Sequence, residues 1–71
     1  MNCLDHQAIG QRLKALRHEK GYSQQEAATR FGLVQSSVSS LEAGHTKLSL
    51  ELAVIIARAL NVSVDALVVE R

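Results

Sequence analysis

Apolar residues along this chain recur every three or four positions, which is the spacing of a helix that packs one face against a core. Ile9, Leu13 and Leu16 form such a stripe near the start of the chain. Asp5 can cap the first turn, and Gly21 suits the left-handed position that follows the last turn. The pattern therefore predicts a first helix between Asp5 and Gly21.

The next two helices are predicted to be short and to be joined by a glycine turn. Ser23 followed three residues later by Glu26 forms a capping box, which starts the second helix, and Gly32 ends it. The third helix is predicted over residues 35–43, with Gly44 closing it. The inner faces of these two helices are predicted to consist of Ala27, Ala28, Phe31, Val38 and Leu41.

Two further helices complete the chain. Ser49 can cap a fourth helix that ends at Asn61, and Ser63 can cap a short fifth helix that contains Leu67. The inward face of the fourth helix is predicted to comprise Leu50, Ala53, Ile56, Ala57 and Leu60. With no Pro, almost no aromatics and no linker or repeat, residues 1–71 are expected to form a single all-α domain with an aliphatic core.

Composition limits the compartment and the partners. The net charge of +1 only weakly favours a polyanion, although residues 1–47 are slightly basic and residues 48–71 slightly acidic. The single cysteine, Cys3, excludes an internal disulfide, so the cytoplasm is the simplest compartment. We expect no signal peptide and no membrane span, because residues 52–57, the longest apolar run, fall far short of roughly 20 residues.

No catalytic, metal or cofactor site is expected. The three histidines His6, His18 and His45 are scattered, and the chain lacks the CxxC or HxxxH spacing of a zinc site. The serines of the third predicted helix have no adjacent His or Lys that could activate them as nucleophiles. The sequence therefore predicts a protein that is not an enzyme.

The short connection around Gly32 forces the second and third helices to cross steeply, and the small Ala28 allows them to approach closely. The side chains left outward on the third helix are then uncharged and polar: Gln35, Ser36, Ser39 and Ser40. Glutamine can pair bidentately with adenine, and serine can donate to or accept from any base. Gln24, with the amides at the start of the second helix, can hold a phosphate.

Residues 23–44, SQQEAATRFGLVQSSVSSLEAG, resemble the helix-turn-helix of the phage-repressor and Cro-like family of bacterial regulators, also called the xenobiotic-response-element family. The other matching stretches are IGQRLKALRHEKGYSQ and SLELAVIIARALNVSVDAL, so the likeness covers residues 9 to about 67. The resemblance implies a compact five-helix, lambda-repressor-like fold. It also implies that the third helix is the recognition helix, which enters the major groove of double-stranded DNA.

The resemblance also implies roles for individual residues. Gln35, Ser36 and Ser40 match base-reading positions, whereas Gln24, His45 and Lys47 match positions that contact the DNA backbone. Arg17 and Glu42 match an ion pair that ties the first helix to the end of the third. The alternative for the polar residues is an ordinary solvated surface, and for the ion pair a surface contact of little energetic value.

Four positions within residues 23–44 depart from the family pattern. Val34 stands before the third helix where a capping Ser, Thr or Asp is usual, so this helix is expected to start weakly. Ala27 is smaller than the usual Leu, and Phe31 is expected to fill the gap. Ser40 and Ala43 replace positions that often carry Arg, Lys or Asn. Fewer phosphate contacts predict a modest DNA affinity with a shallow salt dependence.

An apolar surface on the fourth helix and the C-terminal segment predicts a symmetric homodimer. Leu52 and Ile55 lie outside the inward stripe, at positions that are more often polar in the family, and Val68 and Val69 extend past the last helix. A two-fold dimer would read an inverted repeat with two recognition helices. The alternative is that these four residues cover the core of their own domain.

The predicted function is therefore a cytoplasmic, sequence-specific, DNA-binding transcriptional regulator that acts by occupying a promoter. Two alternatives remain open. One is the antitoxin of a toxin–antitoxin pair, with a toxin bound at the apolar C-terminal end. The other is a protein-interaction module that has lost DNA binding, which the missing cations at Ser40 and Ala43 favour.

Overall fold

The computed structural model describes residues 5–68, which form five helices and no strand. The helices are α1 (His6–Glu19), α2 (Gln24–Phe31), α3 (Gln35–Glu42), α4 (Leu50–Leu60) and α5 (Val64–Leu67). All five predicted helices are present, and the all-α prediction is confirmed. In the described part of the chain, no helix is both long enough and apolar enough to cross a membrane.

Side-chain caps begin four of these helices, as the sequence predicted. Asp5 Oδ1 accepts a hydrogen bond from the Ala8 N–H at 3.1 Å. The hydroxyls of Ser23, Ser49 and Ser63 cap α2, α4 and α5 in the same way. At α2 the capping box is complete, because the Ser23 N–H also donates to Glu26 Oε1 at 3.0 Å.

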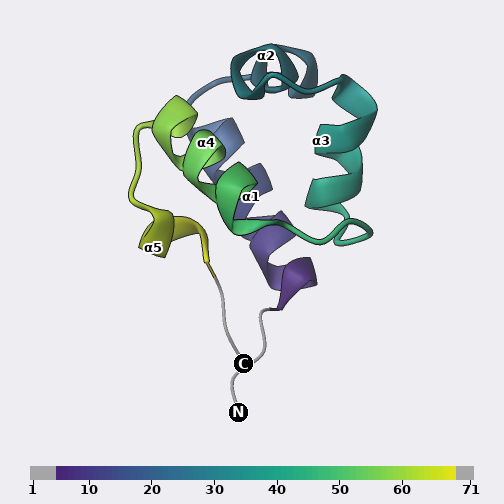
Figure 1. Cartoon of the computed structure of the whole chain (residues 1–71). Coiled ribbons are helices and arrows are strands. Elements are labelled where there is room, and N and C mark those ends of the chain that lie inside the picture. Colours follow the sequence, from purple (N-terminus) through teal and green to yellow (C-terminus); the bar gives the residue numbers. More distant parts are fainter. Residues whose placement is uncertain (1–4, 69–71) are drawn as a thin grey trace.

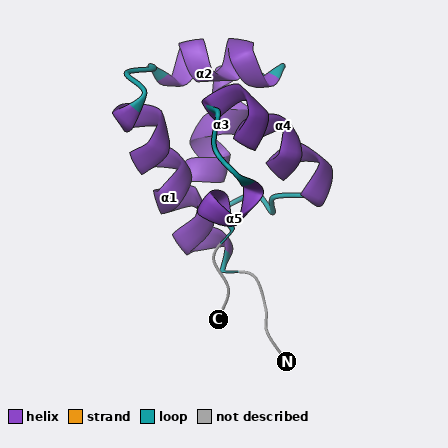
Figure 2. Cartoon of the chain, turned by 90° about the vertical axis from the view of Figure 1, so that its left-hand side faces the viewer, coloured by secondary structure: helices purple, strands orange, loops and turns teal. Residues whose placement is uncertain are grey.

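The five helices enclose one aliphatic core. Figure 1 shows α1 and α4 at the centre of the molecule, with α3 on one side, α5 on the other and α2 across one end. The largest fully buried side chains come from four of the helices: Leu13, Val38, Ile56, Leu60 and Leu67. In the turned view of Figure 2, α2 still lies across the same end. The guanidinium of Arg12 ties α1 to α5 by donating to the Ala66 carbonyl at 3.1 Å.

One predicted core position is wrong. Leu50 was expected to face inward, but its side chain is 75% exposed. It is the first residue of α4, and the residue that turns inward is Leu48, two positions earlier, which is buried. Leu48 precedes the Ser49 cap and belongs with Ala53 to the core cluster, in the arrangement called a hydrophobic staple. The staple therefore takes the place that the periodic pattern assigned to Leu50.

Candidate nucleic-acid interface

The connection from α2 to α3 consists of three residues and turns sharply at Gly32, whose φ is 73°. A side chain at this φ would be strained, and glycine avoids the strain. The Leu33 N–H donates to the Ala28 carbonyl at 2.8 Å, which closes the end of α2. Ala27 and Ala28 are buried in the core, so α2 and α3 can approach closely. The predicted helix-turn-helix geometry is present.

The two sides of α3 differ sharply in character. Val38 is fully buried and Leu41 is 4% exposed, so this side packs into the core. Three of the four predicted base-reading residues, Gln35, Ser36 and Ser39, are exposed on the other side. The fourth, Ser40, is half-buried at its edge. The exposed side of α3 thus presents one amide and several hydroxyls.

The start of α3 lacks a side-chain cap, as the sequence predicted from Val34. The Val34 carbonyl accepts from the Ser37 and Val38 N–H groups at 3.0 and 3.3 Å, so the backbone still enters the helix in a defined geometry. The valine side chain is 65% exposed.

An ion pair between α1 and α3 fixes the far end of α3. Arg17 Nε lies 2.6 Å from Glu42 Oε2, and Arg17 Nη2 lies 3.1 Å from Glu42 Oε1. The side chains of Arg17 and Glu42 are only 7% and 4% exposed, so this contact is not a solvated surface pair. The remaining guanidinium nitrogen, Nη1, donates to the Tyr22 carbonyl at 2.8 Å. A planar fork in which each of the three nitrogens donates a hydrogen bond sets the orientation of its partner more strictly than a lysine would.

Gln24 belongs to this same cluster. Its Nε2 atom donates to Glu42 Oε1 at 3.1 Å, in a partly buried contact. The sequence predicts that Gln24 holds a phosphate, and in the structure one of its two amide hydrogens is bonded to Glu42. No local pattern predicts a contact between residues 18 positions apart. The last residue of α3 is therefore held by α1 and by the start of α2 together.

Gly10 and Gly44 allow α1 to approach α3, a packing role that the sequence did not predict for either glycine. A Cβ atom on Gly10 would lie 2.3 Å from the Leu41 carbonyl oxygen and 2.6 Å from that of Glu42. A Cβ atom on Gly44 would lie 2.8 Å from Gln7 Cα. The signal for Gly10 was a glycine inside an otherwise regular helical pattern, where alanine would favour the helix by about 1 kcal/mol.

The loop that follows α3 carries His45 and Lys47, and both are exposed. Residues 31–46 contain no Lys or Arg, so Lys47 is the first such cation after the turn between α2 and α3. Within residues 5–68, no group of three His, Cys, Asp or Glu side chains is placed to hold a metal ion.

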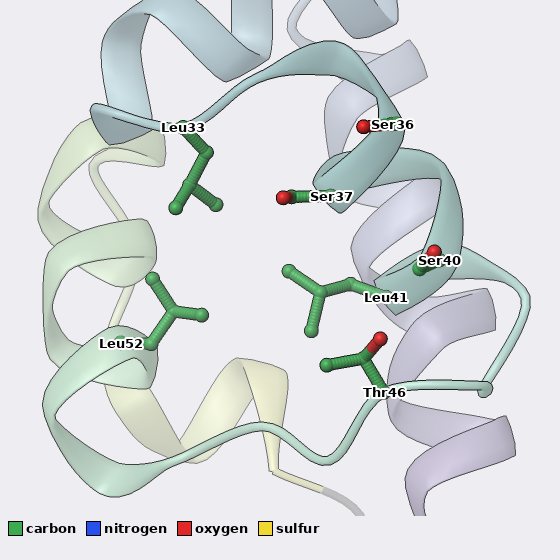
Figure 3. Close-up of a pocket in the computed structure, with 7 residues that line it drawn as sticks. All are labelled: Leu33, Ser36, Ser37, Ser40, Leu41, Thr46 and Leu52. Carbon is green, nitrogen blue, oxygen red and sulfur yellow. The ribbon is translucent and has the colours of Figure 1, made fainter.

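A pocket of about 240 Å³ lies between α3, the loop after it and α4. Figure 3 shows the side chains of Leu33, Ser37, Leu41 and Leu52 pointing into it. Leu52, which the sequence assigned to a dimer interface, is half-buried and packs against the core of its own domain. Of the other residues assigned to that interface, Ile55 is 47% exposed and Val68 is half-buried. The fourth, Val69, lies outside the described residues.

Comparison with known proteins places the chain in a family. Residues 13–67 match the model of the helix-turn-helix family HTH_3. The chain is 41% identical over 64 residues to the HTH-type transcriptional regulator SinR of Bacillus subtilis. This match covers 89% of the chain and 58% of SinR, so the chain spans little more than half the length of that relative.

Two solved structures are also similar. The restriction-modification controller protein C.AhdI from Aeromonas hydrophila superposes with a TM-score of 0.85 at 38% identity, over 89% of this chain and 91% of that one. The biofilm master regulator SinR in complex with DNA superposes with a TM-score of 0.76 at 42% identity, over 83% of this chain and 95% of that one.

Proposed function

Because the chain belongs to the helix-turn-helix family of DNA-binding transcriptional regulators, we propose that α3 enters the major groove of double-stranded DNA and reads its base sequence. The observation that carries this proposal is the division of α3 into two sides. One side is buried in the core, while the other exposes an amide and hydroxyls, all of them uncharged. Such groups suit base edges in the major groove.

Gln35 is the main reader in this proposal. It is the first residue of α3 and is exposed, and its amide can pair with N6 and N7 of adenine. Ser36, Ser39 and Ser40 supply further hydrogen bonds to the bases. Unlike a bidentate amide, a single hydroxyl discriminates weakly, because it can donate to or accept from any base.

Contacts to the DNA backbone come from the loop after α3 and from the start of α2. Lys47 and His45 are exposed on that loop. Gln24 has one amide hydrogen on Glu42, which leaves a second N–H for a phosphate oxygen. Because this surface holds few cations, its affinity is expected to fall only gently with added salt.

Replacing Gln35 tests base reading. The DNA is a duplex selected from random sequence by the protein itself. Gln35→Ala should weaken binding to this duplex by about 1–3 kcal/mol and weaken binding to random DNA much less. Gln11→Ala is the matched control, because Gln11 is an exposed glutamine on α1. Equal losses on both duplexes would show that Gln35 holds phosphate rather than a base.

The same titration separates the alternatives. An absence of binding to any duplex at low salt and micromolar protein would favour a protein-interaction module over a regulator. An antitoxin would still bind DNA, but it would also need a toxin partner, which co-purification from the native host would reveal.

A homodimer that reads an inverted repeat is the finer part of the proposal. Ile55 supports it, because a large apolar side chain that is 47% exposed on α4 is free to meet a second copy. Leu52 supports it less, since its side chain faces its own domain. A two-fold dimer would place two recognition helices roughly 34 Å apart on one face of the duplex.

Sedimentation of the free protein tests this arrangement. We expect a dimer at micromolar concentration and a folded monomer for Ile55→Glu, with an unchanged helical circular dichroism spectrum because Ile55 lies outside the core. A monomeric wild-type protein would refute the dimer.

A further inference from the structure

One large apolar side chain stands on the proposed reading surface with nothing in the described chain to cover it. Val34 directly precedes α3 and is 65% exposed, and its neighbours Gln35 and Ser36 are exposed as well. The other large apolar residues that are exposed within residues 5–68, Leu50 and Ile55, both lie on α4. Val34 is therefore the apolar element of the surface that includes Gln35.

Val34 is the N-cap residue of α3, a position at which the other described helices have a side-chain oxygen. The other four described helices begin with Asp or Ser, whose side chain accepts a hydrogen bond from the first turn. At α3 this capping hydrogen bond is absent because valine has no side-chain acceptor, and the helix is less stable as a result. The hydrogen bonds from Ser37 and Val38 to the Val34 carbonyl nevertheless hold the backbone at this point. The valine methyls are thus presented, largely exposed, at a defined position beside Gln35.

The chemistry of the major groove supplies one apolar partner. The edges of the four base pairs carry hydrogen-bonding groups and a single kind of methyl, the C5 methyl of thymine. A valine pressed against a polar edge would displace water without replacing its hydrogen bonds, which is unfavourable. Against a thymine methyl, both surfaces leave water and the contact is favourable.

We propose that Val34 is a specificity residue that packs against the methyl group of a thymine within one or two base pairs of the base read by Gln35. This inference rests on the proposed function, because it requires α3 to lie in the major groove. Val34 belongs to the proposed reading surface, since Val34 and Gln35 are adjacent and both are exposed.

Deoxyuridine tests the proposal, because it differs from thymidine only by the missing methyl. Each thymine of the selected duplex is replaced in turn, and dissociation constants are measured by fluorescence anisotropy. For the wild-type protein we expect one position per half-site, beside the base whose recognition Gln35→Ala abolishes, at which uracil weakens binding roughly fourfold. That factor corresponds to the loss of one buried methyl-sized group.

Val34→Ser should bind the thymine and uracil duplexes equally at this position, and Val34→Ala, which keeps a single methyl, should prefer thymine less than the wild type does. Val34→Ser also restores a capping hydroxyl, so its thermal midpoint should rise, which excludes unfolding as the cause. Leu50→Ala is the matched control, because it removes a similarly exposed apolar side chain from α4 and should leave the thymine preference unchanged.

Three results would overturn the inference while DNA binding itself remained intact. The first is a selected half-site with no thymine near the base read by Gln35. The second is an equal affinity of the wild-type protein for thymine and uracil duplexes at every position. The third is a thymine preference that survives in Val34→Ser. Failure to bind any duplex would instead refute the proposed function, and the two failures are thereby distinguished.

Discussion

Replacing Gly10 by alanine should destabilise the protein, although the same change normally stabilises a helix. In an exposed helix interior, alanine is favoured over glycine by about 1 kcal/mol. At Gly10 the new Cβ would lie 2.3 and 2.6 Å from the carbonyl oxygens of Leu41 and Glu42. Both are backbone atoms of α3, so no side-chain rotation can relieve the overlap, and α1 must separate from α3.

The magnitude follows from two opposing effects. Overpacking that shifts the backbone typically costs about 1–3 kcal/mol, and contacts this short belong at the upper end of that range. After the helix-propensity gain of about 1 kcal/mol is subtracted, a net loss of about 2 kcal/mol remains. For a domain of this size, that loss lowers the thermal midpoint by roughly 10 °C.

Thermal and urea unfolding, followed by circular dichroism, measure this change. Ala15→Gly is the matched control, because Ala15 is exposed on the same helix and its replacement should cost only about 0.5–1 kcal/mol through propensity. The reasoning would be refuted by a Gly10→Ala variant as stable as the wild type or more stable. Such a result would mean that α1 and α3 do not approach as closely as the structure shows.

The remaining predictions concern the charged groups that position α3 and α2. Arg17→Ala should lower the free energy of unfolding by about 3–5 kcal/mol in urea titrations, because it leaves the Glu42 carboxylate buried without its cation. The double variant Arg17→Met, Glu42→Met should lose much less, and additive losses would contradict this account. The hydrogen bonds from the Ser23 backbone and side chain hold the pKa of Glu26 below its ordinary value of 4.5. A lowered carboxyl pKa stabilises the fold above pH 4.5, and this stabilisation is lost as the pH falls through the folded-state pKa. Glu26→Gln should therefore unfold with a weaker dependence on pH in the acid range, and an unchanged acid dependence would exclude Glu26 as a contributor.

The helices and their ends were predictable because their causes are local. A cap is set by residues three positions apart, as in Ser23 and Glu26, and a left-handed terminator is a single glycine such as Gly32. The buried side of α3 was predictable for the same reason, because Val38 and Leu41 lie three residues apart on one helix. Leu50 shows where this reasoning fails. Periodicity cannot tell whether the first residue of a helix or the residue before its cap turns inward.

The candidate site was predictable only in part. The sequence and its family resemblance predicted the polar composition of the exposed side of α3 and the pairing of Arg17 with Glu42. They did not predict that Gln24 donates to the same carboxylate, because that contact joins two helices across 18 positions. The dimer residues remain a prediction, and the structure turns one of them, Leu52, toward its own core.

The sequence by itself determined where the helices lie, which side of each is apolar, and that the exposed residues of α3 are amides and hydroxyls rather than cations. These properties depend on short-range spacing and on residue chemistry. Only the tertiary structure decided the angle at which α3 is held. That angle depends on the approach of two backbones at Gly10 and on a buried cluster around Glu42. Contacts between residues distant in sequence have no periodicity, so they become visible only when the chain is folded.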